Sequence, residues 1–176
     1  MRRHLSTQSM GTSTYTIVRD QGIDRFVART GIAFTQAVDA ARRKKNGTVD
    51  AATGRDISNR WAREMRLRYL NGRRWGVQTG IPGPTGGGDL RSMRLFDLVF
   101  VVGSAHVGIE VQTTNYDEVG HKPHQVSAQE MWVSEVMAPN LAYAYKIYAG
   151  NGKEHLPVMK RYSAFGKWQD LSRLLR

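Results

Sequence analysis

Two apolar segments separated by a short break stand out in the pattern of the chain. They cover residues 96–102 and 107–114, and their runs of β-branched and aromatic residues predict two β-strands. Each otherwise apolar segment carries one carboxylate, Asp97 in the first and Glu110 in the second. Burying a carboxylate is costly unless it is paired, so these two residues require a specific role.

The two strands are expected to form an antiparallel hairpin. A two-residue turn sets Asp97 directly opposite Glu110, whereas a four-residue loop sets it opposite Gln112. Because side chains alternate along a strand, all three residues share one face in either case, and the wholly apolar opposite face is expected to be the core face. Neighbouring carboxylates repel each other. Either one is protonated, or a divalent cation binds between them, or both reach solvent separately.

Helical spacing of apolar residues precedes the hairpin. It predicts one bent helix or two short ones over residues 23–45, ended by a cluster of cations and a glycine. A second helix is predicted over residues 56–70, with Asp56 or Ser58 as its N-cap, and a short strand over residues 75–79.

The pattern after the hairpin predicts three further elements. These are a helix over residues 127–137 capped by Ser127, a strand over residues 141–148 and a final amphipathic helix over residues 165–175. Tyr143 and Tyr145 share one face of that strand, where packing is a better explanation than base stacking. We expect residues 1–14 to be a flexible tail and residues 15–176 to form a single domain.

Charge is distributed unevenly along this basic chain. The formal net charge is +11, but residues 76–120 contain two Lys or Arg against five acids. A basic body around an acidic segment is expected where a polyanion binds outside and a metal inside, although basicity alone also fits a protein with no such role. The chain has no cysteine, no signal-peptide pattern and no apolar window of membrane-spanning length. We expect a soluble, cytoplasmic protein with no membrane partner.

The predicted helix over residues 56–70 is the most basic element. Its cations include Arg55, Arg60 and Arg63, which either form an ordinary charged surface or contact phosphates. Glu64 lies beside the apolar stripe of this helix and can either pair with a neighbouring arginine or reach the acidic hairpin.

Two other segments carry only weak signals. The glycine-rich residues 80–88 lack the Gly-Lys-Ser/Thr ending of a phosphate-binding loop, so no nucleotide cofactor is expected. His121 and His124 flank a proline that interrupts helical spacing, and no third ligand follows, which makes a zinc site a weak interpretation.

The order of elements and the placement of the acids resemble the PD-(D/E)xK nuclease superfamily, which includes restriction endonucleases and Holliday junction resolvases. Phe96-Asp97 stands where that family has Pro-Asp, and Glu110-Val111-Gln112 stands where it has (Asp/Glu)-x-Lys. The resemblance covers residues 56–148. It implies an α/β (α+β) fold with a restriction-endonuclease-like mixed central sheet flanked by helices, in the core order αβββαβ.

The resemblance also implies roles for individual residues. Asp97 and Glu110 would bind Mg²⁺, or Mn²⁺ in its place, and the Val111 carbonyl would complete the metal site. Glu64 would match the helix carboxylate that some members add. Gln112 replaces the family's lysine and can orient water but can neither carry charge nor take a proton. Some restriction endonucleases of the superfamily have Glu-x-Gln here and are active, and Lys122 or Lys146 could supply a relocated cation.

The resemblance therefore leads us to expect a metal-dependent DNA endonuclease, most nearly a restriction enzyme acting as a homodimer. Asp97, Glu110, Gln112 and Glu64 would be its catalytic residues. A separate group, consisting of Arg55, Arg60, Arg63 and Lys122, would contact DNA. The alternatives are a resolvase or repair nuclease, an inactive nucleic-acid-binding module with the same fold, and a basic interaction protein whose acids have no catalytic role.

Overall fold

The computed structural model describes most of the chain outside its N-terminus and several connecting segments. The described residues are 14–44, 47, 49–69, 75–76, 96–102, 105–113, 123–136, 142–150, 155–163 and 167–176. Residues 1–13 of the predicted tail, His121 and Lys122 lie outside these ranges, whereas Thr14 begins the first helix.

The described elements form a mixed α+β structure. The helices are α1 (Thr14–Lys44), α2 (Ala51–Tyr69), α4 (Pro123–Met131), the π-helix η2 (Trp132–Val136) and the 3-10 helix η3 (Ser172–Leu175). The strands are β1 (Trp75–Gly76), β2 (Leu98–Val102), β3 (Ala105–Gln112), β4 (Ala142–Tyr148), β5 (Val158–Ser163) and β6 (Lys167–Asp170).

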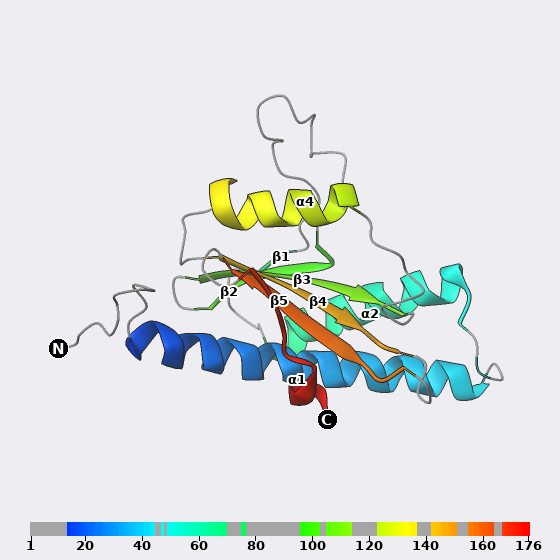
Figure 1. Cartoon of the computed structure of the whole chain (residues 1–176). Coiled ribbons are helices and arrows are strands. Elements are labelled where there is room, and N and C mark those ends of the chain that lie inside the picture. Colours follow the sequence, from blue (N-terminus) through cyan, green and yellow to red (C-terminus); the bar gives the residue numbers. More distant parts are fainter. Residues whose placement is uncertain are drawn as a thin grey trace.

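The six described strands form one sheet in the order β1-β2-β3-β4-β5-β6. Only β3 and β4 are parallel to each other, and the other four neighbouring pairs are antiparallel. A parallel pair needs a long crossover connection, and α4 lies in the segment that joins β3 to β4. Helices α1 and α2 cover one face of the sheet and α4 covers the other (Figure 1). We call these the α1 face and the α4 face.

Each sheet face has its own apolar core. The larger cluster lies between the α1 face and helices α1 and α2, and its sheet residues include Leu98, Ile109 and Val111. The smaller cluster lies on the α4 face and consists of Phe96, Trp132, Val133, Ala142 and Ala144. The face opposite the acids is therefore the main core face, as predicted. The acidic face is also covered, because α4 packs on it.

The predicted hairpin is confirmed, with the register of a two-residue turn. Val102 pairs with Ala105 and Leu98 with Ile109, so the alternative that set Asp97 opposite Gln112 is wrong. The predicted helix over residues 23–45 is one longer helix, α1. The helix continues through Gly31. A Cβ at that position would lie 3.0 Å from side-chain atoms of both Ile147 and Leu175. The missing side chain allows α1 to pack closely on the sheet.

Two predicted helix starts are wrong. Helix α2 begins at Ala51, and its N-cap is Asp50, whose Oδ1 accepts a hydrogen bond of 2.7 Å from the Thr53 N–H. Helix α4 begins at Pro123 instead of Ser127. Proline is tolerated in the first turn because the N–H that it lacks would have no helical partner there.

The predicted C-terminal helix is also wrong, since this region forms β6 and the short helix η3. Trp168 and Leu171 fit helical spacing, but Trp168 faces the α4 cluster while Leu171 belongs to the core on the α1 face. Residues 167–170 form a strand because they pair with β5, a strand that the sequence pattern did not predict. Among the described helices, none has the length and apolar character needed to span a membrane.

Candidate functional site

Glu110 lies on the α4 face of the sheet. Glu110 alternates along β3 with Ile109 and Val111, whose side chains are in the core of the α1 face, so its own side chain points the other way. Glu110 is 6% exposed and Asp97 is 7% exposed. Both acids are therefore removed from bulk solvent, which excludes the interpretation that each reaches water separately on an open surface.

Asp97 lies just outside β2, at a β-bulge. Its N–H donates a 2.9 Å hydrogen bond to the carbonyl of Ile109, whose Cα partner in the ladder is already Leu98. Two consecutive residues thus face one residue of β3, which is the arrangement that defines a bulge. The Oδ2 of Asp97 accepts a 2.9 Å hydrogen bond from the N–H of Val111. The Asp97 carboxylate therefore occupies a ladder position at Val111, the residue that follows Glu110.

The bulge also turns Phe96 onto the α4 face, where regular alternation would not place it. Its fully buried ring packs edge-on against Trp132 of η2, with ring centroids 4.9 Å apart. On the other side it covers Gly108, where a Cβ would come within 2.6 Å of the ring. The packing of Phe96 holds the chain immediately before Asp97. The sequence analysis missed this role, although a glycine inside a strand signals close approach of another group.

Gly108→Ala is expected to lower the free energy of unfolding by about 1–3 kcal/mol, because the added methyl group must displace the Phe96 ring. The measurement is urea denaturation followed by circular dichroism. Gly22→Ala is the matched control, since a Cβ at Gly22 on α1 meets nothing within 4 Å and alanine favours the helix. Equal stability of the two variants would contradict the packing described for Phe96.

Gln112 and Val111 lie where the sequence analysis placed them. Gln112 shares the face of Glu110 at the carboxyl end of β3 and is partly exposed. Its carbonyl accepts a 2.9 Å hydrogen bond from the Ala149 N–H. The Val111 side chain is buried in the core of the α1 face. The structure thus brings Asp97, Glu110, Val111 and Gln112 together.

Glu64 does not join this group. It is exposed on α2, the helix that covers the opposite sheet face (Figure 1). No three His, Cys, Asp or Glu side chains of the described residues form a group that could hold a metal ion. A divalent ion at Asp97 and Glu110 would therefore need backbone and water oxygens as its other ligands. That set suits Mg²⁺, which commonly binds one or two carboxylates and keeps several waters.

The arginines predicted to contact DNA lie on the other side of the sheet from the carboxylates. Arg55, Arg60 and Arg63 are exposed on α2, and Arg60 forms a 2.5 Å ion pair with Asp56. Arg55 follows Gly54, which packs on Thr113 just beyond the end of β3, so it is near the carboxyl end of that strand. Helix α1 adds exposed cations to the same layer: Arg25, Arg29, Arg43 and Lys44.

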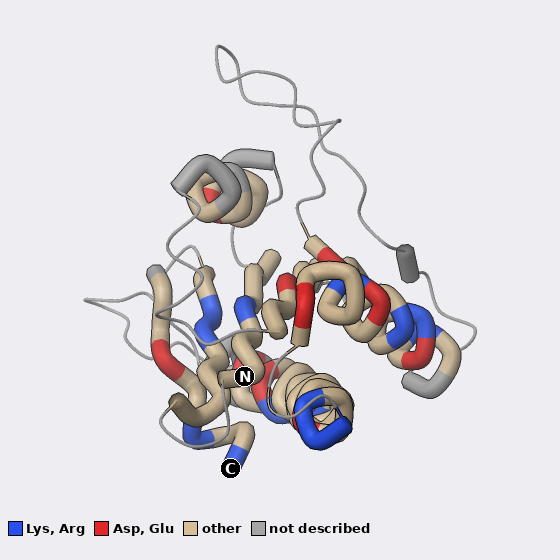
Figure 2. Tube along the Cα trace, turned by 90° about the vertical axis from the view of Figure 1, so that its right-hand side faces the viewer, with Lys and Arg blue, Asp and Glu red and all other residues tan. Residues whose placement is uncertain are grey.

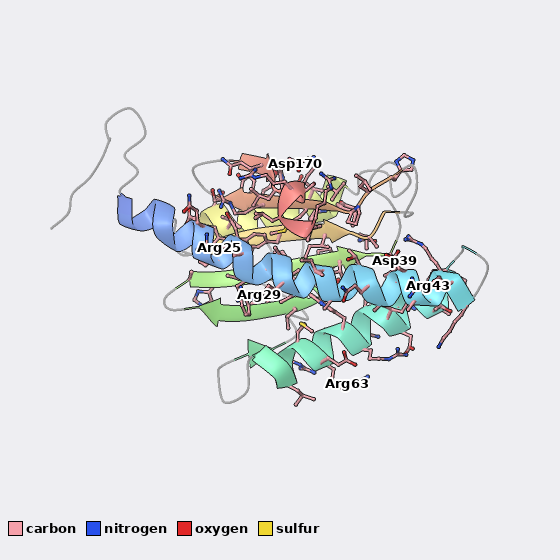
Figure 3. The ribbon with its side chains drawn as sticks, turned by 90° about the horizontal axis from the view of Figure 1, so that it is seen from below. Arg25, Arg29, Asp39, Arg43, Arg63 and Asp170 are labelled. Atoms are coloured by element: carbon pink, nitrogen blue, oxygen red, sulfur yellow. The ribbon has the colours of Figure 1, made fainter. Side chains whose placement is uncertain are left out.

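Figure 3 shows Arg25, Arg29 and Arg43 along α1 and Arg63 on α2, on the helical layer seen from below. Figure 2 shows basic positions on both of these helices, whereas α4 contains no Lys or Arg. The surface of α1 and α2 is thus rich in cations, and the sheet separates it from the two acids.

Arg42 connects the ends of the two parallel strands. Its Nη2 donates to the Thr113 carbonyl at 2.9 Å and to the Gly150 carbonyl, while Nη1 pairs with Asp39 at 3.3 Å. The sequence pattern showed this arginine only as part of the cluster of cations that ends the predicted helix. Its actual role depends on β3 and β4 ending side by side, which no local pattern reveals.

A buried polar network on the α1 face joins α1 to the sheet. Nη1 of Arg161 lies 2.9 Å from Oδ1 and 2.7 Å from Oδ2 of Asp24, and the Tyr145 hydroxyl donates to the same Oδ1 at 2.7 Å. Burial, reinforced by the negative charge of Asp24, raises the pKa of Tyr145 well above its usual value. Tyr143 donates to Asp20. The prediction that both tyrosines serve packing is confirmed, and their hydroxyls also anchor α1.

Comparison with known proteins adds no information about this site. No protein-family model matches the chain, and no curated protein or solved structure matches it either.

Proposed function

We propose that this chain is a Mg²⁺-dependent endonuclease that hydrolyses phosphodiester bonds in DNA, most nearly a restriction-type enzyme. The observation that carries the proposal is the pair of buried acids, with Asp97 bonded to the N–H of the residue after Glu110. A second observation supports it. Along the chain, two helices are followed by three antiparallel strands, then a helix, and then a strand that is parallel to the third strand. This is the element order of the nuclease core.

In this proposal each residue of the group has a distinct role. Asp97 and Glu110 would hold the metal, and the Val111 carbonyl and water would supply its other ligands. The ion would acidify a bound water and offset charge on the phosphate. Gln112 is two residues beyond Glu110 on the same face, and its amide orients the attacking water. The oxygen of that water bonds to phosphorus while one backbone P–O bond breaks. The water gives up a proton and the leaving oxygen gains one.

The proposed substrate contacts follow from the cations of the helical layer. Arg55 is the best placed of the three α2 arginines, since Gly54 beside it packs on Thr113 at the end of β3. Arg60 and Arg63 would contact phosphates further along the backbone, which adds affinity without sequence preference. Two copies of the chain would cut the two strands of a duplex.

Supercoiled plasmid DNA incubated with Mg²⁺, Mn²⁺ or EDTA tests the proposal. We expect nicked and linear products with either ion and none with EDTA, because the metal supplies the nucleophile. Sequencing the product ends separates a restriction enzyme, which leaves one recurring sequence, from a repair nuclease, which does not. A four-way junction substrate tests the resolvase alternative. Failure to cut any of these DNAs with any divalent ion would refute the proposal.

One observation favours a second candidate, a nucleic-acid-binding module without catalytic activity. The exposed cations of α1 and α2 lie across the sheet from the acids, so DNA could bind there without reaching Asp97 or Glu110. Binding that weakens steeply with salt, without cleavage under any divalent ion, is the outcome expected of this candidate.

A further inference from the structure

Lys146 is a third buried charged residue beside the two acids. It is the Cα partner of Glu110 in the parallel pairing of β3 and β4. Tyr145 and Ile147, on either side of it, are in the core of the α1 face, whereas Ala144, two residues earlier, is in the cluster under α4. Alternation therefore places Lys146 on the same face as Glu110. Like the acids, it is more than nine-tenths buried, with 7% exposure.

The charges of this face account for a buried lysine at that position. Asp97 and Glu110 lie in a region of low solvent access, where an isolated carboxylate is strongly disfavoured. Lys146, paired with Glu110 on the adjacent strand, supplies opposite charge on this face, and buried charges persist where they are compensated in this way.

Aromatic packing supports Lys146 on the side away from Glu110. Its Nζ lies 5.9 Å from the centre of the Trp168 ring, within the range of a cation–π interaction. The Trp168 indole N–H in turn donates a 2.6 Å hydrogen bond to Glu130 of α4. A chain of contacts therefore runs from β4 through β6 to α4, and it limits the positions that the ammonium group can occupy.

We infer that Lys146 is the catalytic cation of the carboxylate site, and that it supplies the positive charge that Gln112 cannot. This inference rests on the proposed nuclease function. Lys146 contacts a non-bridging oxygen of the phosphate and stabilises the negative charge that develops there as water attacks. It transfers no proton, so the reaction balance stated above is unchanged. The substrate group recognised at this point is a phosphodiester.

The chain provides a matched control in Lys160. This residue is the Cα partner of Lys146 on β5, so it lies on the same face but one strand further from Glu110. Lys160 is the Cα partner of Asp170 on β6, whose pKa is lowered mainly by hydrogen bonds from Ser172 and to a smaller extent by the charge of Lys160. Lys160 is thus a lysine of the same sheet row that does not neighbour the carboxylates.

The test compares Lys146→Met, Lys146→Arg and Lys160→Met with the parent protein in single-turnover plasmid cleavage with Mn²⁺. We expect Lys146→Met to slow cleavage by about 100-fold or more, because one preorganised electrostatic contact to the transition state is lost. Lys146→Arg should retain part of the rate, and Lys160→Met should stay within about threefold of the parent. Mn²⁺ binding by Lys146→Met, followed by electron paramagnetic resonance, should be unchanged or tighter.

The possible results separate the two proposals. If the parent cleaves and Lys146→Met matches it, or if both methionine variants lose equal activity, the role of Lys146 is refuted and the nuclease proposal stands. If the parent cleaves no DNA with any divalent ion, the nuclease proposal fails and this role fails with it.

A folding measurement tests the neighbour relation without activity. Lys146→Met should melt below the parent, and Glu110→Gln combined with Lys146→Met should melt above Lys146→Met alone, since a neutral Gln needs no cation. A double variant that melts no higher would contradict the inferred charge pairing.

Discussion

Glu110→Gln is expected to reduce metal-dependent DNA cleavage by at least about 10³-fold, because it removes one of two carboxylates proposed to hold the metal. Glutamine has nearly the same shape, so the buried face should keep its packing. Cleavage rate at saturating Mn²⁺ and Mn²⁺ affinity are the two measurements, and both should fall. Asp56→Asn is the matched control, because Asp56 is an exposed carboxylate on α2 whose ion pair with Arg60 is solvated and contributes little.

Asp97 allows the metal role to be separated from the structural role. Asp97→Asn keeps an oxygen that can accept the Val111 N–H, so it should lose cleavage to a similar extent while retaining stability. Asp97→Ala leaves that buried N–H without its partner and should also lower the free energy of unfolding by about 1–3 kcal/mol. Parental cleavage rates in Asp97→Asn and Glu110→Gln would refute the site.

Arg161→Met is expected to cause the largest loss of stability, about 3–5 kcal/mol, because it leaves the buried Asp24 without its cation. For a chain of this size that corresponds to a fall in Tm of about 6–20 °C. Urea and thermal unfolding followed by circular dichroism measure the change. Arg25→Met is the control, since Arg25 is next to Asp24 in sequence but exposed on α1.

The double variant Asp24→Leu/Arg161→Met should recover much of that loss, because two apolar side chains need no charge compensation. This distinguishes an uncompensated charge from a simple packing defect. Arg161→Met with the same stability as Arg25→Met would show that the network contributes little. Neither residue belongs to the carboxylate site, so cleavage well below the melting temperature should be retained in both variants.

Local pattern was sufficient for several elements of this protein. The alternation of apolar and polar residues predicted the hairpin and put Glu110 and Gln112 on one face, since side-chain direction in a regular strand follows from sequence spacing alone. Asp97 was assigned to the same face by the same spacing, but the bulge interrupts the alternation at that residue. The observed register, with Val102 paired to Ala105, is one of the two that spacing allowed. The long helix α1 was predicted for the same reason, although its full extent was not.

Other features depended on which segments meet in space. Trp168 and Leu171 suit a helix as well as a strand, and pairing with β5 decided between the two. The bulge at Asp97 could not be foreseen, because it arises from how Phe96 packs between Gly108 and Trp132. That packing involves three segments that are distant in sequence.

The sequence alone determined that the two strands of one hairpin each carry a carboxylate within a basic chain, because strand pattern and charge are local properties. The tertiary structure alone decided what surrounds them. The parallel pairing of β3 with β4 sets Lys146 beside Glu110, and packing of α4 encloses the face. Strand order places the arginines of α2 on the opposite side. Spacing along the chain does not determine which residues surround the acids. That depends on which strand pairing and which crossover connection bury the most apolar surface.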